Sequence, residues 1–168
     1  MPIHTQKTVN IIRIDNVTLH EKIKRRMLPA CISEYVTRFA LCQIDCRGIF
    51  LSGGRSTEPY LSKCQLLNVL REEWNEVILP PLNIARQAHS SISFEHKVYV
   101  VCGSRGYNDL VHSIEVLGLR MREDSSVSFV SKAWSIFEPK NFVLRTNPLL
   151  APLSGSRLLV YGGIKNFT

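Results

Sequence analysis

The side chains that most often bind metals are scattered through this 168-residue sequence rather than grouped. A zinc site needs ligands at short, repeated spacings, such as one cysteine pair followed by a second pair. Cys42 and Cys46 are followed by no second pair, and no histidine stands beside another metal ligand at a suitable spacing. We therefore expect no metal and no other cofactor, and we expect reduced cysteines that behave as small buried side chains. The histidines are His4, His20, His89, His96 and His112.

Two glycine-containing segments could be mistaken for nucleotide-binding loops. Gly53 to Ser56 reads GGRS and Gly103 to Gly106 reads GSRG. A phosphate-binding loop also needs a lysine and a following helix, and neither segment has them. No Gly-x-Ser-x-Gly nucleophile motif occurs either. The sequence therefore predicts a protein that is not an enzyme.

The composition is that of a globular protein with a basic surface. Hydrophobic residues make up 45% of the chain and the formal net charge is +7. No apolar run approaches the ~20 residues that span a bilayer. The segment from Met1 to Lys7 lacks the apolar stretch of a signal peptide, so we expect a cytoplasmic protein. The basic cluster from Lys22 to Arg26 predicts the solvated face of an outer strand, and polyanion binding is the weaker alternative.

One local pattern occurs three times along the chain. A short run of apolar and aromatic residues ends in glycine at Gly48–Gly54, His96–Gly103 and Arg157–Gly163. Each run predicts a buried strand, and its glycines permit backbone angles that other residues resist. The spacings of about 50 and 60 residues make this an internal repeat.

The repeat divides the chain into four parts, each built from strands. A back half-unit covers 8–29, complete units cover 36–82 and 85–139, and a front half-unit covers 145–168. The second complete unit carries an insert at about 118–130 with a polar middle. Period-2 alternation and β-branched residues recur, and no helical pattern does, so we expect an all-β fold.

These residues resemble the kelch repeat, the four-stranded unit of kelch β-propellers. Arg86 and His89 match the opening of its first strand, and Arg38 opens the preceding unit without a following histidine. The resemblance extends to the diglycines Gly53-Gly54 and Gly162-Gly163, the tryptophans Trp74 and Trp134, and the repeat length of about 50.

The resemblance implies an incomplete arc of antiparallel, four-stranded blades within a single kelch-repeat region over 1–168. The two tryptophans would fill the space between blades. Propellers close with 4 to 8 blades, and this chain holds about three. We therefore expect the missing blades to come from a longer protein or from self-association.

The resemblance also places partner binding on the loops that follow the glycines. An arginine in each loop, Arg55 and Arg105, would suit a carboxylate-bearing peptide. The alternative is that both arginines are ordinary solvated loop residues. The complete set of expected partner-binding residues is Arg55, Ser56, Thr57, Ser104, Arg105 and Asn108.

Two functions follow from the resemblance. The first is a non-catalytic interaction module that binds a protein or peptide, with an acidic one among the candidates, as an adaptor or a cytoskeletal scaffold. The second is a fragment of a propeller enzyme of the galactose oxidase type, whose copper ligands and catalytic residues would lie outside this chain. We expect no membrane and no nucleic-acid partner.

Overall fold

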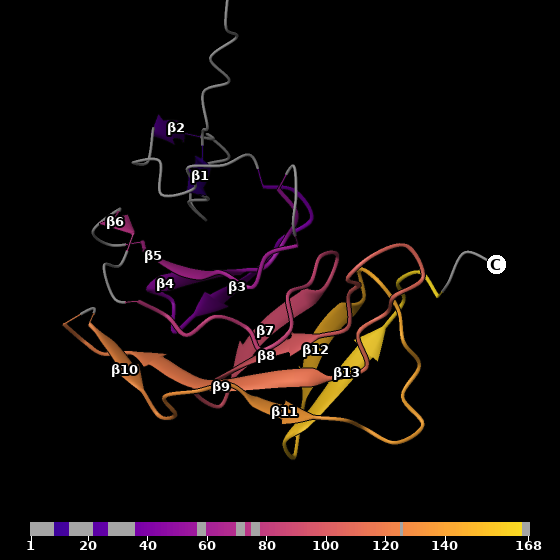
Figure 1. Ribbon diagram of the computed structural model, residues 1–168. Helices are drawn as coiled ribbons and strands as arrows, with labels where there is room; N and C mark the ends of the chain where they lie inside the picture. The colour runs from indigo at the N-terminus through magenta and orange to yellow at the C-terminus, as the bar shows by residue number, and fades with distance from the viewer. Residues whose placement is uncertain are drawn as a thin grey trace, which may run out of the picture. The chain divides into compact units, whose positions relative to one another are not determined.

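The computed structural model describes residues 9–13, 22–26, 36–56, 60–69, 73–74, 78–124 and 126–165 (Figure 1). The chain divides into two compact units, Met1–Ser33 and Glu34–Thr168, and each is described by itself. All regular elements in the described ranges are β-strands in antiparallel sheets, with no helix among them. The predicted all-β class is confirmed.

The first unit contains one hairpin, formed by β1 (Val9–Arg13) and β2 (Lys22–Arg26). Ile12 lies opposite Ile23 in its register. Both strands lie within the half-unit predicted over 8–29. The expected solvation of the Lys22–Arg26 side chains lies outside what the structure describes.

The second unit begins with a four-stranded sheet in the order β3-β4-β5-β6. The tight turn between β3 and β4 contains Asp45 and Cys46 at φ of 46° and 59°. Positive φ at successive turn residues matches the right-handed twist of a hairpin. The strand bounds are β3 Ala40–Ile44, β4 Gly48–Ser52, β5 Cys64–Asn68 and β6 Glu73–Trp74.

The next sheet repeats this plan with an added hairpin. Strands β7 (Ser90–Phe94), β8 (Lys97–Val101) and β9 (Ile114–Met121) pair in sequence, and β11 (Ser135–Phe137) pairs with the first part of β9. The insert is more ordered than a loop, because β9 runs on past Leu117 and pairs with β10 (Val127–Phe129). Leu119 and Met121, both from the insert, are buried.

A final hairpin follows, formed by β12 (Leu149–Leu153) and β13 (Arg157–Tyr161). The first strand of each repeat contacts the first strand of the next repeat, since β7 packs beside both β3 and β12. Figure 1 shows the three sheets following one another in this order within the second unit. The described strands of this unit thus form successive sheets joined at their first strands.

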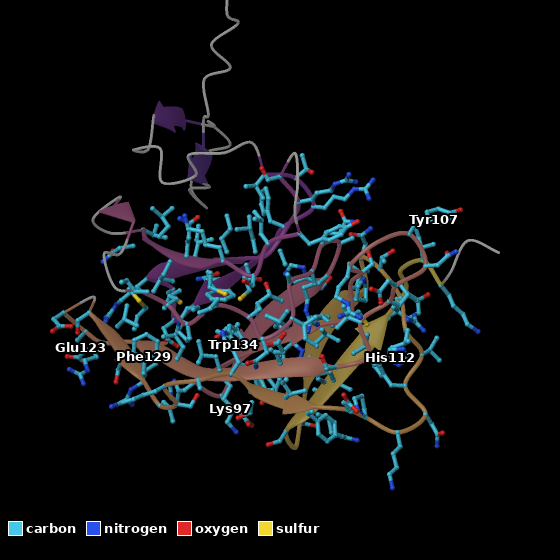
Figure 2. The ribbon with its side chains drawn as sticks, in the orientation of Figure 1. Lys97, Tyr107, His112, Glu123, Phe129 and Trp134 are labelled. Atoms are coloured by element: carbon cyan, nitrogen blue, oxygen red, sulfur yellow. The ribbon has the colours of Figure 1, made fainter. Side chains whose placement is uncertain are left out.

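The hydrophobic core lies between the sheet of β3–β6 and the sheet of β7–β11. Ile44, Phe50 and Leu66 of the first sheet pack with Val98 and Leu117 of the second. Trp134 joins this core, as Figure 2 shows by its position between the sheets. Its Nε1 donates a hydrogen bond to the Pro80 carbonyl at 2.9 Å, and its ring centroid lies 5.9 Å from that of Phe50.

The two tryptophans, Trp74 and Trp134, lie in different repeats. Trp134 packs between two sheets, as the sequence predicted. For Trp74 the structure describes the backbone, which pairs with Leu67 in β5, and its side chain lies outside the described residues.

The glycines after β4 and β8 allow neighbouring repeats to approach closely. The Gly54 N–H donates to the Arg86 carbonyl at 2.8 Å, and Gly103 makes the same bond to Arg145. A Cβ on Gly53, whose φ is 55°, would lie 2.5 Å from the Arg86 carbonyl oxygen of the next repeat. A side chain cannot occupy that space, so glycine is required.

A second set of hydrogen bonds crosses between repeats. Ala88 donates its N–H to the Arg38 carbonyl, and Asn147 donates to the Ala88 carbonyl. All three residues have φ near 50°, which is unusual for residues other than glycine. This chain of bonds, the inter-repeat ladder, identifies Arg38, Ala88 and Asn147 as equivalent positions.

The inter-repeat ladder changes one alignment made from the sequence. Because Arg38 is equivalent to Ala88, the residue equivalent to Arg86 is Val36. Arg145 is the true counterpart of Arg86, since its Nε donates to the carbonyl two residues earlier and its Nη1 donates to Gly162, as Arg86 does to Ile84 and Cys102. Arg38 is therefore not a kelch-type opening arginine.

Candidate functional site

The loops that follow the glycine-ended strands lie at one end of the second unit. Short backbone bridges close their bases: Thr37 pairs with Arg55, Gln87 with Ser104, and Thr146 with Ile164. In Figure 2, Tyr107 marks this end, and Glu123 and Phe129 of the insert hairpin mark the opposite one. The repeat therefore places the described parts of three equivalent loops side by side at one end.

These loops surround a pocket of about 380 Å³, which we call the loop pocket. All three repeats contribute to its wall, so the pocket depends on the packing of the sheets. Its polar lining residues are Arg38, Arg55, Tyr60, Gln87, Ser104, Tyr107, Asn108, Thr146 and Asn147.

Arg55 is held against one wall of the loop pocket. Its guanidinium carbon lies 5.9 Å from the centroid of the Tyr60 ring, within the range of a cation–π interaction. A Cβ on Gly106 would lie 3.7 Å from the Tyr60 hydroxyl, so this ring reaches the loop of the neighbouring repeat. Tyr60 therefore forms part of the boundary between two repeats.

Arg105 has a different environment from Arg55. Its Nε lies 3.0 Å from Asp109 Oδ2, and its Nη2 donates to Asp109 Oδ1 at 3.2 Å. It lines a second pocket of about 320 Å³ beside His112 and Glu138. The structure therefore does not bring Arg55 and Arg105 together, and Arg105 is already paired with a carboxylate.

The structure locates five of the six residues expected to bind a partner. Arg55, Ser104 and Asn108 line the loop pocket. Arg105 lines the second pocket, and Ser56 is half-buried and lines neither of these two. Thr57 lies outside the described residues. Their role in binding stays a prediction.

Sequence reasoning missed several residues of the loop pocket, above all Arg38, Tyr60, Gln87 and Asn147. Arg38 and Asn147 reach the pocket because each follows a residue of a closing bridge and has positive φ. Aligning the segment YVTRFA with ARQAHS and LRTNPL would have placed Arg38 at the same position as Ala88 and Asn147. Tyr60 carries no comparable signal.

The backbone beneath the loop pocket is fixed by a buried ion pair. Arg86 and Glu115 have fully buried side chains, 2.7 Å apart. All five N–H groups of the guanidinium are used, because Arg86 also donates to carbonyls of Ile84, Cys102 and Ser113 and to the Ser113 hydroxyl. Burial lowers the pKa of Arg86, an effect that Glu115 opposes.

Glu115 is also fully engaged. It accepts backbone hydrogen bonds from Asn83 at 2.6 Å and Ile84 at 3.1 Å. The pair therefore fastens the connection between two repeats to strand β9. These contacts support a structural role for Arg86, which the sequence analysis identified only as a motif residue.

His89 is a second buried polar residue between repeats. Its Nε2 is 2.9 Å from the Ser52 hydroxyl of the preceding repeat. Burial, helped by the nearby Arg86 charge, lowers the pKa of His89 to about 3. The imidazole is therefore neutral at physiological pH and serves packing.

The cysteines and acidic residues show no metal-binding arrangement within the described ranges. Cys42, Cys46, Cys64 and Cys102 carry free thiols. Burial raises the pKa of Cys42 to about 11 and raises that of Cys64 further. Such thiols are poor nucleophiles at neutral pH.

Comparison with known proteins assigns no family. No protein-family model matches the chain, and no curated protein matches it. In the part of the chain that the structure describes, no helix has the length and apolar character that crossing a bilayer requires.

Proposed function

We propose that this chain is a kelch-type arc of propeller blades that binds a protein or peptide through its loop pocket. The fold part of the proposal is supported by the recurring strand plan and by the contacts of β7 with β3 and β12. First strands that succeed one another around an axis are the arrangement of propeller blades. The inter-repeat ladder agrees with this arrangement.

The loop pocket is the observation that carries the functional part. Rigid strands hold loops from three repeats around one concavity, which is how scaffold proteins commonly present binding residues. Arg38 and Arg55 supply its charge. Guanidinium groups stay protonated and bind carboxylates through paired hydrogen bonds, so they suit binding better than proton transfer. An acidic peptide is the expected partner.

A peptide-display selection on the purified chain tests this function. We expect enrichment of peptides that contain Asp or Glu, and a weakening of their binding by about tenfold or more when Arg55→Ser removes one guanidinium. Ser is the residue that the next repeat has at this position, Ser104, so the fold should tolerate it.

The matched control is Lys97→Ala, which removes one positive charge from an exposed position of β8 outside the loop pocket. Its affinity should equal that of the unmodified chain. Selection of peptides without acidic residues, or equal losses in the two variants, would contradict the proposal.

A further inference from the structure

The described residues that line the loop pocket carry positive charge alone. Two arginines are the only charged residues among its lining residues as the structure describes them, and the other polar groups there are hydroxyls and amides. Within the described residues, the contact of Arg55 with the Tyr60 ring is the only cation–π contact, hydrogen bond or ion pair of either guanidinium. Two cationic groups therefore face a concavity with no carboxylate among the described residues of its wall.

The backbone holds the two arginines as neighbours. Thr37 and Arg55 exchange both of their backbone hydrogen bonds, at 2.9 and 2.8 Å, and Arg38 follows directly. The Arg38 carbonyl is fixed in turn by the inter-repeat ladder. Both side chains thus extend from backbone that hydrogen bonds already fix. Less conformational entropy of the backbone is therefore lost when a ligand binds.

The other repeats lack this charge. At the position of Arg38 they have Ala88 and Asn147, and at that of Arg55 they have Ser104 and Ile164. The fold therefore does not require arginine at either position. One repeat concentrates the charge on one side of the loop pocket, opposite neutral hydrogen-bonding groups.

Gln87 adds an acceptor to this wall. The residue is 4% exposed, and its buried Oε1 has no hydrogen-bond partner among the described residues. A buried acceptor without a donor is unfavourable, and a rotation of the Gln87 side chain towards the pocket would let a ligand N–H supply the missing bond. The pocket therefore fits a ligand that has both anionic oxygens and a nearby N–H. A phosphorylated residue within a peptide has both, whereas free phosphate has no N–H.

We propose that the loop pocket binds a phosphoserine or phosphothreonine residue of a partner peptide. A phosphate monoester carries about −1.5 to −2 charges and three acceptor oxygens at pH 7, which matches two guanidinium groups better than one carboxylate does. Arg38 and Arg55 bind the phosphate, and Gln87 accepts a backbone N–H beside it. This inference rests on the proposed function and specifies its ligand.

Three pools of capped nonapeptides test the inference. Their central residue is phosphoserine, glutamate or serine, and the flanking residues are randomised. We expect the phosphoserine pool to bind at least tenfold more tightly than the glutamate pool. Equal affinity of these two pools would overturn the inference and leave the proposed function standing. Failure of both pools to bind would overturn both proposals.

Substitutions taken from the other repeats locate the binding. Arg38→Asn and Arg55→Ser introduce the residues found at the equivalent positions 147 and 104, so the fold is expected to persist. Each should weaken phosphoserine-pool binding at least tenfold. Arg105→Ala is the matched control, because Arg105 is paired with Asp109 and lies outside the loop pocket. Equal losses in all three variants would overturn the inference.

The pH dependence gives a readout that loss of structure would not reproduce. The second phosphate pKa is about 6, so the dianion accepts a proton as the pH falls from 7.5 to 5.5. Phosphoserine-pool affinity should fall over this range, while glutamate-pool affinity should stay nearly constant, and no histidine or carboxyl group lines the described wall. Phosphoserine-pool affinity that does not change with pH would overturn the inference.

Discussion

His89 illustrates how a motif residue acts through burial. It is almost fully enclosed, it contacts Ser52 through Nε2, and its Nδ1 has no hydrogen-bond partner among the described residues. An imidazolium would need an acceptor for each N–H and would lie near the Arg86 charge. The fold therefore holds the neutral form, and protonation must oppose folding.

This arrangement predicts acid sensitivity. The pKa of His89 falls from 6.5 to about 3 on folding, so below pH 6.5 the unfolded chain binds the additional proton. The free energy of unfolding should be unaffected by His89 above pH 6.5 and should fall with decreasing pH down to about 3. The slope contributed by this one group is at most about 1.4 kcal/mol per pH unit.

Urea denaturation at several pH values between 7.5 and 4 measures this slope. His89→Gln keeps a polar side chain that does not titrate in this range, so its curve should be flatter than that of the unmodified chain. Parallel curves for the two proteins would show that His89 is already solvated or charged in the folded state.

Among individual residues, those with a strict backbone or packing role were predictable from the sequence. The residues of the loop pocket were predictable only in part. Gly54 and Gly103 are fixed by positive φ and close contacts, which leave a strong pattern. Arg38 leaves a weaker pattern, which only an alignment of the repeats shows, since the same backbone position holds Ala88 and Asn147 in the other repeats. A side chain that the backbone position does not constrain need not repeat.

Between elements, the Arg86–Glu115 pair connects the chain segment at 83–86 to strand β9. Removing one member leaves a buried charge without its partner, which typically costs about 3–5 kcal/mol. We expect this loss for Glu115→Leu, measured as the change in free energy of unfolding.

The double variant Arg86→Met with Glu115→Leu should be less destabilised than Glu115→Leu alone, because no uncompensated charge remains. Additive losses in this double-mutant cycle would contradict a coupled pair. If one of these variants is unfolded in buffer, the free energies of unfolding of all variants can be measured in the same stabilising osmolyte and compared there.

The presence and order of the strands could be predicted from the sequence, but the hairpin within the insert could not. Its polar middle suggested a loop over about 118–130, whereas β9 and β10 form a hairpin there. Leu119 and Met121 alternate with polar residues and enter the core, a short period-2 pattern that the surrounding charges obscured. Asp45 of the neighbouring sheet accepts the Met121 N–H at 2.8 Å, a tertiary contact that sequence cannot show.

Across the whole second unit, the hairpin β12–β13 exposes one apolar face. Leu149 lies opposite Tyr161 in the register, and the two are 68% and 67% exposed. In the described residues β13 pairs only with β12, so it also has a free edge. Exposed apolar faces and unpaired strand edges promote association.

We therefore expect concentration-dependent association of the isolated chain. Leu149→Lys together with Tyr161→Lys should shift the sedimentation profile towards the monomer, because both changes add charge to the exposed face. Lys97→Ala serves as a surface control. An unchanged profile in the double variant would exclude this face as the main contact.

The inter-repeat ladder has a consequence for how the second unit unfolds. Its hydrogen bonds join residues of successive repeats, so one repeat cannot open without exposing backbone groups of the next. Repeat proteins of this kind behave as nearest-neighbour chains in which interfaces, rather than isolated repeats, provide the cooperativity. The amides of Ala88 and Asn147 should consequently exchange with solvent deuterium at similar, slow rates, as members of one cooperative block.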